Sequence, residues 1–192
     1  MRTLIIGDSM VGRVSGPKYQ LRGGGHVLWC GEGGLKLGGL LDRLTRFLKS
    51  QRRPSTFIIH VGTNDLFDKN STTTDTRAKV EEVLSSLRRL CPDSRIIWSD
   101  ILPRAFYWKA NRQSAGKKCV SNINRFAHSL CTKSHNMHFV RHSLVLNEND
   151  HSLFMYDCVH LSPAGKQILL DNWANALVYF NSHPSEVGFT AV

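Results

Sequence analysis

The chain has 192 residues, of which 41% are hydrophobic, and a formal net charge of +10 at pH 7. This length suits a single domain with a full core, and the ordinary apolar content excludes a chain that is disordered throughout. No apolar run approaches the roughly 20 residues that cross a bilayer, and the start of the chain lacks the layout of a signal peptide. We therefore expect an intracellular, cytoplasmic protein, and its abrupt start is compatible with a domain cut from a longer one.

Short β-rich runs alternate with runs of helical period along the chain. We predict five strands, each a nearly continuous apolar stretch of the kind that a parallel sheet buries on both faces. These strands are Thr3–Gly7, His26–Cys30, Thr56–Gly62, Arg95–Ile101 and Met137–Arg141.

Apolar stripes at helical spacing lie between and after these strands, and we interpret them as core-facing helices. The stripes run from Leu37 to Leu48, from Val80 to Leu90, from Val120 to Leu130 and from Leu169 to Phe180. Ser162-Pro163 precedes the last stripe and is a typical helix start, with an N-cap serine and a proline in the first turn. The alternation predicts a three-layer α/β/α, flavodoxin-like sandwich with a five-stranded parallel sheet, formed by residues 1–182 and followed by a C-terminal tail, 183–192.

Polar or glycine-rich turns follow the first three predicted strands. Ser9 ends the run Gly7-Asp8-Ser9, a glycine turn spans residues 31–34, and Asn64 lies in Gly62-Thr63-Asn64-Asp65. In a parallel sheet the carboxyl ends of the strands meet at one edge, where ligands bind. We therefore expect Ser9, the glycine turn and Asn64 to lie at the same edge.

The run Asp157-Cys158-Val159-His160, near the end of the chain, supplies the groups that a serine nucleophile needs. A serine hydroxyl is a weak nucleophile without a neighbouring base, and an imidazole titrates near neutral pH. A carboxylate three residues earlier can hold that imidazole in the correct tautomer. This predicts Ser9, His160 and Asp157 as nucleophile, base and orienting acid. The alternative interpretation is a polar loop that caps the helix after Ser162.

Acyl transfer also requires hydrogen-bond donors for the developing oxyanion. The candidates are the backbone N–H of Ser9, a glycine N–H from Gly33 or Gly34, and the side-chain amide of Asn64. Each segment has a plain structural alternative, a turn for the glycines and a helix cap for the run around Asn64. Their order along the predicted strand ends favours the functional interpretation.

Together these blocks resemble the SGNH hydrolases, also called the GDSL esterase/lipase superfamily, from residue 4 to about residue 180. The resemblance implies hydrolysis of carboxylic esters or thioesters through an acyl-enzyme, without a metal or organic cofactor. It implies catalytic roles for Ser9, Asp157 and His160, and an oxyanion hole formed by Ser9, Gly33 or Gly34, and Asn64. Leu35-Lys36 departs from the small polar residues that usually follow the second-block glycine, so the acyl pocket is left undefined.

A narrower resemblance rests on Gly7-Asp8-Ser9-Met10, Trp29-Cys30-Gly31-Glu32-Gly33-Gly34 and His60-Val61-Gly62-Thr63-Asn64-Asp65. These runs are similar to the esterase domain in the first-open-reading-frame protein of some vertebrate LINE-type retrotransposons. This resemblance implies an intracellular domain of a ribonucleoprotein, with acetyl-type esterase activity and contact with lipid.

The region from Ile101 to Asn147 contains no Asp or Glu and is rich in Lys, Arg and His. It predicts either a positive surface that binds RNA or an anionic membrane, or a solvated helix face. A binding module of this kind is the alternative to an esterase. Tyr107 and Trp108 in this region are candidates for a wall of the substrate cleft or a membrane-docking patch.

The five cysteines lack paired spacing, which indicates reduced thiols rather than a disulfide framework or a zinc site. Cys158 is the weaker candidate nucleophile, because Asp157 and His160 have a better-placed partner in Ser9. His60 is expected to be a hydrogen-bonded core histidine. Neither glycine cluster matches a dinucleotide-binding or phosphate-cradling loop.

Overall fold

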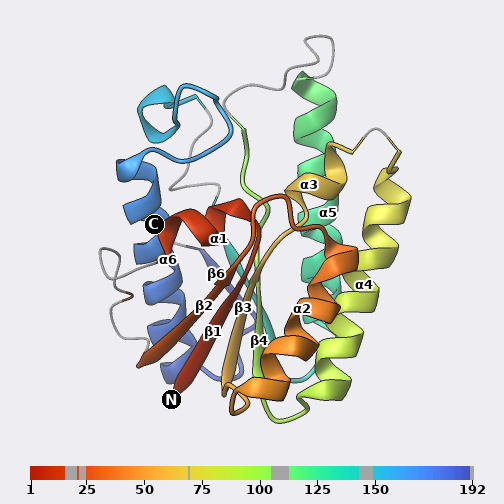
Figure 1. Ribbon diagram of the computed structural model, residues 1–192, viewed down its shortest axis with the longest axis vertical. Coiled ribbons are helices and arrows are strands. Elements are labelled where there is room, and N and C mark those ends of the chain that lie inside the picture. Colours follow the sequence, from red (N-terminus) through yellow and green to blue (C-terminus); the bar gives the residue numbers. More distant parts are fainter. Residues whose placement is uncertain (16–20, 22–24, 69, 105–112, 143–148, 191–192) are drawn as a thin grey trace.

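The computed structural model describes residues 1–15, 21, 25–68, 70–104, 113–142 and 149–190 (Figure 1). Its strands form one six-stranded sheet in the order β2-β1-β3-β4-β5-β6, and every neighbouring pair is parallel. The strands are β1 (Arg2–Gly7), β2 (His26–Gly31), β3 (Thr56–His60), β4 (Arg95–Ser99), β5 (Met137–Arg141) and β6 (Gly188–Thr190).

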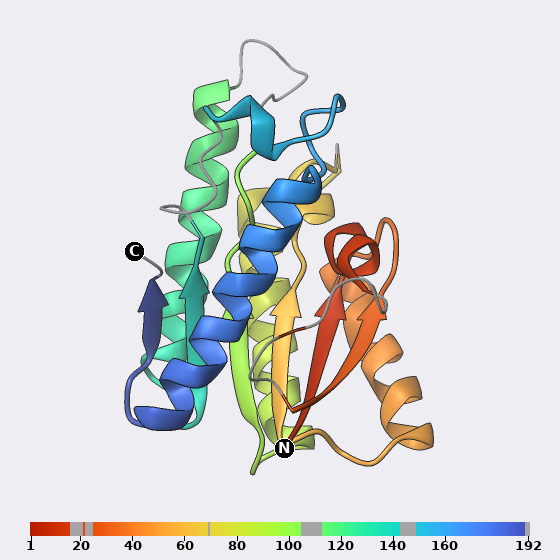
Figure 2. The same cartoon turned by 90° about the vertical axis from the view of Figure 1, so that its left-hand side faces the viewer.

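Helices cover both faces of this sheet (Figures 1 and 2). One face carries α2 (Leu37–Ser50), α4 (Thr73–Leu90) and α5 (Gln113–Cys131), and the other carries α1 (Ser9–Val14) and α6 (Pro163–Ser182). The short helix α3 (Thr63–Leu66) and the 3-10 helix η2 (His151–Leu153) complete the described helices. The predicted α/β/α sandwich with a parallel sheet is therefore confirmed.

Alternate residues of each strand feed two separate cores, because successive side chains of a strand point to opposite faces of the sheet. Leu4 and Ile6 of β1 pack with the α2, α4 and α5 layer, whereas Ile5 packs with the α6 layer. All three side chains are fully buried. This burial on both faces explains the continuous apolar runs in the sequence.

The prediction of five strands was wrong by one edge strand. The sixth strand, β6, pairs with β5 and brings Phe189 opposite Val140. It has three residues, which are too few to form an apolar run or an alternating pattern from which a strand could be predicted. Two predicted strands also ran too far, since β3 ends at His60 and β4 at Ser99.

The predicted helix stripes correspond to α2, α4, α5 and α6, with one exception at a helix end. Leu90, the last residue of α4, is 41% exposed and does not belong to the core. The predicted start of α6 is confirmed, because Ser162 Oγ accepts a hydrogen bond from the Gly165 amide at 3.2 Å, with Pro163 in the first turn.

Two further observations concern the whole described chain. All five cysteines are free thiols, as their spacing predicts. Within the described ranges, no helix combines the length and the apolar character that a membrane span requires.

Candidate active site

Ser9 is the first residue of α1, directly after the sharp turn that follows β1 at the carboxyl edge of the sheet. The Asp8 carboxylate caps α1 by accepting a hydrogen bond from the Met10 amide at 2.9 Å. The Asp8 amide donates to the His60 carbonyl at 3.2 Å, which ties the turn to β3. Gly7 allows this approach, because a Cβ atom there would lie 1.9 Å from the His60 carbonyl oxygen. The Gly-Asp-Ser run therefore supplies close packing, a helix cap and a presented hydroxyl in successive residues.

Three of the predicted site residues form one hydrogen-bonded chain. Ser9 Oγ lies 3.0 Å from His160 Nε2, although 151 positions separate the two residues in sequence. His160 Nδ1 lies 2.6 Å from Asp157 Oδ2 on the other side of the ring. The side chains of His160 and Asp157 are 19% and 31% exposed, so solvent and small molecules reach this chain of groups.

The Asp157 carboxylate is held in its ionised form. Burial alone would raise its pKa, but hydrogen bonds from the His160 ring and from the amides of His160 and Val159 lower the pKa of Asp157 to about 2. An ionised Asp157 accepts from His160 Nδ1–H, which leaves the lone pair of Nε2 directed toward Ser9.

Backbone contacts fix the loop that carries Asp157 and His160. The Met155 amide donates to the His160 carbonyl at 2.7 Å, and the Cys158 amide donates to the Met155 carbonyl at 2.9 Å. Cys158 takes a left-handed φ of 56°, unusual for a residue with a side chain. Its thiol contacts the Tyr156 carbonyl, whereas His160 Nε2 contacts Ser9. The base is therefore directed to the serine and not to this cysteine.

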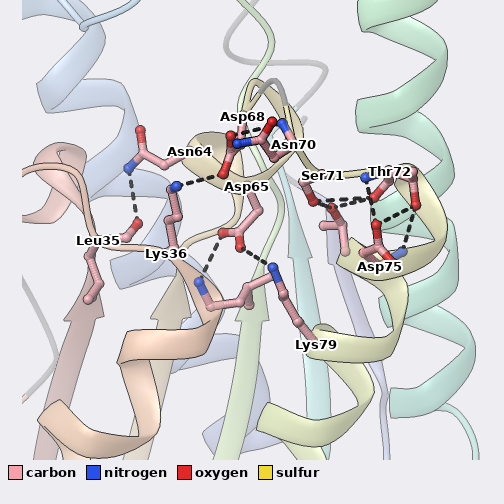
Figure 3. A network of polar contacts seen from close by, with 12 residues as sticks. Leu35, Lys36, Asn64, Asp65, Asp68, Asn70, Ser71, Thr72, Asp75 and Lys79 are labelled. Carbon is pink, nitrogen blue, oxygen red and sulfur yellow. Dashed lines mark hydrogen bonds and ion pairs between the residues drawn. The ribbon is translucent and has the colours of Figure 1, made fainter.

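Asn64 connects the third sequence block to Leu35, the residue directly after the glycine turn. Its Nδ2 donates to the Leu35 carbonyl at 3.0 Å, and Lys36 pairs with Asp68 at 2.7 Å (Figure 3). An amide nitrogen carries two hydrogens, so Asn64 retains a second N–H for a ligand. Among the described residues no hydrogen bond joins Asn64 to Ser9, but they follow the adjacent strands β3 and β1.

Asp65 caps a helix that has no side-chain cap of its own. The N-cap residue of α2, Lys36, makes no side-chain hydrogen bond, and Asp65 Oδ2 accepts from the Leu37 amide at 2.9 Å instead. The Asp65 side chain is fully buried, with Lys79 Nζ 3.7 Å from its other oxygen (Figure 3). Burial raises the pKa of Asp65. The capping interpretation of this block is therefore correct for Asp65, while Asn64 bonds the glycine turn.

The glycine turn follows β2 at the same edge of the sheet. Gly31 packs against α1, where a Cβ atom would lie 2.1 Å from the Gly12 nitrogen. Gly33 and Gly34 have open space around them, and Gly34 has a φ of 76°. Within the described residues neither of their amides has an acceptor, and the Ser9 amide lies in the first turn of α1, where no intrahelical acceptor exists. All predicted donors thus lie on the three turns after β1, β2 and β3.

Arg104 is a residue of this site that sequence reasoning did not single out. It lines a small pocket together with Asp8, Thr63 and Val159. Its guanidinium donates to Thr63 Oγ1 at 3.3 Å and lies 3.8 Å from the centre of the Phe67 ring. The pocket is also lined by Asp8, whose pKa burial raises to about 6. In the sequence, the signal that could have identified Arg104 was its position shortly after β4, at the carboxyl edge of the sheet. Tyr107 and Trp108 lie outside the described residues.

A second serine–histidine contact is buried between the sheet and α6. Ser99 Oγ lies 2.8 Å from His142 Nε2, and His142 Nδ1 lies 2.6 Å from Asn172 Nδ2. The same Asn172 nitrogen donates to the Arg141 carbonyl at 2.8 Å, which fixes the orientation of the amide. His142 Nδ1 is therefore an acceptor and Nε2 a donor, so His142 cannot take a proton from Ser99. Ser99 is fully buried and is not a candidate nucleophile.

The predicted core role of His60 is confirmed by this buried cluster. His60 Nδ1 lies 2.8 Å from Ser99 Oγ, which also accepts from Trp173 Nε1 at 2.8 Å. The serine hydroxyl thus donates to His60 and accepts from two neighbours, which uses its full capacity. Burial lowers the pKa of His60 to about 4 and that of His142 well below its usual value. Both imidazoles are neutral in the folded protein.

Comparisons with known proteins show the family and the fold of this chain. Residues 6–168 match the GDSL-like Lipase/Acylhydrolase family. A Streptococcus pneumoniae protein named for platelet activating factor is 25% identical, with a TM-score of 0.74 over 91% of this chain and 83% of its own. An acetylxylan esterase from Geobacillus stearothermophilus is 18% identical, with a TM-score of 0.70 over 92% of this chain and 93% of its own.

A third solved structure, a GDSL-like lipase from Bacteroides thetaiotaomicron, is 20% identical. Its TM-score is 0.67, over 93% of this chain and 88% of its own. A search of curated proteins gave no match. The two structures below 25% identity support the fold alone.

Proposed function

The chain belongs to the GDSL-like lipase/acylhydrolase family, and we propose that it is a serine esterase that acts on short-chain, acetyl-type carboxylic esters. The observation that carries this proposal is the contact of Ser9 Oγ with His160 Nε2 at 3.0 Å, with Asp157 at 2.6 Å from the opposite ring nitrogen. A nucleophile, a base and an orienting carboxylate in hydrogen-bond reach are the requirements for acyl transfer.

In the proposed reaction, Ser9 Oγ attacks the ester carbonyl while His160 Nε2 takes its proton. Asp157 stabilises the imidazolium that forms. The oxyanion accepts hydrogen bonds from the Ser9 amide, from the Gly33 or Gly34 amide, and from the Asn64 side chain. His160 then protonates the leaving alcohol, and water releases the acyl group by the same steps in reverse order.

Two observations support a short acyl group. The small cavity lined by Asp8 and Val159, the chain neighbours of Ser9 and His160, has a volume of about 10 Å³, which is room for about one water molecule. The Geobacillus stearothermophilus protein of similar fold is an acetylxylan esterase. Together these two observations support an acetyl-sized acyl group.

The test compares Ser9→Ala with the wild type on p-nitrophenyl acetate, butyrate and octanoate. We expect Ser9→Ala to lose turnover by about 10⁴-fold or more while keeping the wild-type unfolding curve. We expect the wild type to prefer acetate. A Ser9→Ala protein that keeps the wild-type rate would show that another group is the nucleophile.

Ser99→Ala is the matched control, because Ser99 also contacts a histidine but is fully buried. Its removal leaves His60, His142 and Trp173 short of a partner, which costs about 1–3 kcal/mol for each unsatisfied buried group. We expect Ser99→Ala to lower the unfolding free energy and to retain esterase activity below its melting temperature.

The alternative proposal is a binding module that holds RNA or an anionic membrane through residues 101–147. The basic composition of that region supports it, and the accessible Ser9–His160–Asp157 chain favours the enzyme. The retrotransposon setting remains a hypothesis that none of the reported comparisons supports. RNA affinity that does not fall with salt would contradict the binding module, since phosphate contacts release counterions.

A further inference from the structure

A second cavity of about 300 Å³ lies at the same edge of the sheet, between α5 and the ends of β4 and β5. It shares Ile101 and Pro103 with the small pocket beside Asp8 and Val159. Because the two cavities have these wall residues in common, they lie next to each other, and the smaller one is lined by Asp8 and Val159, the chain neighbours of Ser9 and His160. This volume is at the lower end of the range for small-molecule sites.

Basic side chains from two elements line this second cavity. They are Lys117 and Arg125 on α5 and Arg141 at the end of β5. Among the described lining residues, the one acidic group is Asp100, which is 7% exposed. Asp100 Oδ1 already accepts from His128 Nε2 at 2.6 Å, and burial raises its pKa. The field in the cavity is therefore positive.

The walls of this cavity are fixed by contacts that do not involve a ligand. Asn124 on α5 accepts from the Ile101 amide at 2.9 Å and donates to the Ile101 carbonyl at 3.1 Å. The His128 ring stacks on Phe139 with 3.8 Å between centres, and the Arg141 guanidinium lies 5.0 Å from the same ring centre. Ile101 in the shared wall and the side chains of His128 and Arg141 are thus held in place before any ligand binds.

We propose that this cavity is a subsite for an oxyanionic group, such as a phosphate, carried by the ester substrate. The proposal rests on the proposed esterase function. Guanidinium groups bind phosphate oxygens through paired N–H donors, and here two arginines and a lysine line one cavity that is open to solvent. Because the cavity lies next to the pocket lined by Asp8 and Val159, an anionic group on the ester substrate fits it better than a polymer backbone, which would need an extended groove.

The test compares two acetyl esters that differ in charge, p-nitrophenyl acetate and 4-acetoxyphenyl phosphate. The proteins are the wild type, Arg125→Ala, Arg141→Ala and the control Arg46→Ala, an exposed residue on α2 with the same change in charge. We expect KM for the phosphate ester to rise about tenfold in the first two variants and to change less than about twofold in the control. KM for p-nitrophenyl acetate should change less than about twofold in all of them.

Inhibition by inorganic phosphate tests whether the cavity binds the phosphate group of the substrate or only free phosphate. We expect phosphate to inhibit wild-type hydrolysis of the phosphate ester competitively, and to inhibit Arg141→Ala about tenfold less strongly. If phosphate inhibits in this way but the phosphate ester has no KM advantage over p-nitrophenyl acetate, the cavity binds free phosphate and the substrate subsite is overturned.

Two further outcomes separate this proposal from the esterase itself. The subsite is overturned if KM for the phosphate ester changes equally in Arg125→Ala, Arg141→Ala and Arg46→Ala. The esterase proposal then still holds, provided that turnover depends on Ser9. The subsite is also overturned if Arg125→Ala and Arg141→Ala lose affinity for single-stranded RNA without a change in KM for the phosphate ester. If no protein hydrolyses either ester, the esterase proposal fails. Calorimetry with inorganic phosphate then decides whether Arg141 holds an anion.

Discussion

At the scale of single residues, the position of one proton distinguishes the two serine–histidine contacts of this protein. Asp157 accepts from His160 Nδ1–H, so Nε2 is free to accept the Ser9 proton. Asn172 donates to His142 Nδ1, so Nε2 carries a proton and donates to Ser99. A carboxylate partner produces a base and an amide donor produces a structural histidine, at serine–histidine distances that differ by only a few tenths of an ångström.

Asp157→Asn tests the role of this carboxylate. The Asn side chain can donate to His160 Nδ1 and would favour the tautomer that has its proton on Nε2. We expect kcat for p-nitrophenyl acetate to fall about 10³- to 10⁴-fold with little change in KM. The measurement is steady-state kinetics beside Asp150→Asn, an exposed cap of η2 that should retain activity. Equal rates in the two variants would remove Asp157 from the mechanism.

At the scale of elements, the site is assembled by loops that brace one another. The turn after β1 is tied to β3 through Asp8, and the segment after β3 is tied through Asn64 and Asp65 to Leu35 and Leu37, which follow the glycine turn. These contacts join sequence blocks that lie on three different turns. The loops therefore form a rigid unit at the carboxyl edge, as an active site requires.

Asp65→Ala tests this bracing. The variant removes the cap of α2 and leaves Lys79 without its buried partner, so we expect a loss of about 1–3 kcal/mol in unfolding free energy. We also expect a lower kcat, because the Asn64 segment loses its anchor. Urea denaturation and ester kinetics measure both effects. Asp68→Ala, which breaks an exposed pair with Lys36, should change stability by less than about 1 kcal/mol. A similar loss in both variants would contradict the bracing role.

The sequence patterns predicted the elements that are long and periodic. The apolar runs located β1 to β5, and the stripes located α2, α4, α5 and α6. The helices α1 and α3 and the strand β6 have between three and six residues, too few for a period to appear. The Ser9–His160–Asp157 contacts were predicted from residue types at strand ends. The roles of Arg104 and Asp65 were not, because they depend on tertiary contacts that no local spacing encodes.

At the scale of the whole molecule, a buried polar cluster joins the sheet to α6. His60 from β3, Ser99 from β4 and His142 after β5 meet Asn172 and Trp173 from α6. Burial keeps both histidines neutral, with the pKa of His60 lowered to about 4. The unfolded chain therefore binds protons to these groups at a higher pH than the folded chain does, and stability from this cluster is lost on acidification.

His60→Gln isolates that effect. A depressed folded pKa contributes stability that is complete above pH 6.5 and is lost as the pH falls toward 4. Asp8, whose pKa is raised to about 6, acts in the opposite direction but is common to both proteins. We expect acidification through this window to cost the wild type on the order of 3 kcal/mol more than His60→Gln. Urea denaturation across the window measures it, with exposed His135→Gln as control. Parallel pH profiles for wild type and His60→Gln would contradict the assignment.

The proposed esterase reaction requires that Ser9 becomes acylated, and covalent trapping detects a reactive Ser9. The wild type is treated with diisopropyl fluorophosphate, and the adduct is located by peptide mass spectrometry while esterase activity is followed. We expect one adduct, on Ser9, in proportion to the activity lost, and its near absence in Asp157→Asn. Full labelling of another residue, or activity that survives stoichiometric modification of Ser9, would contradict it.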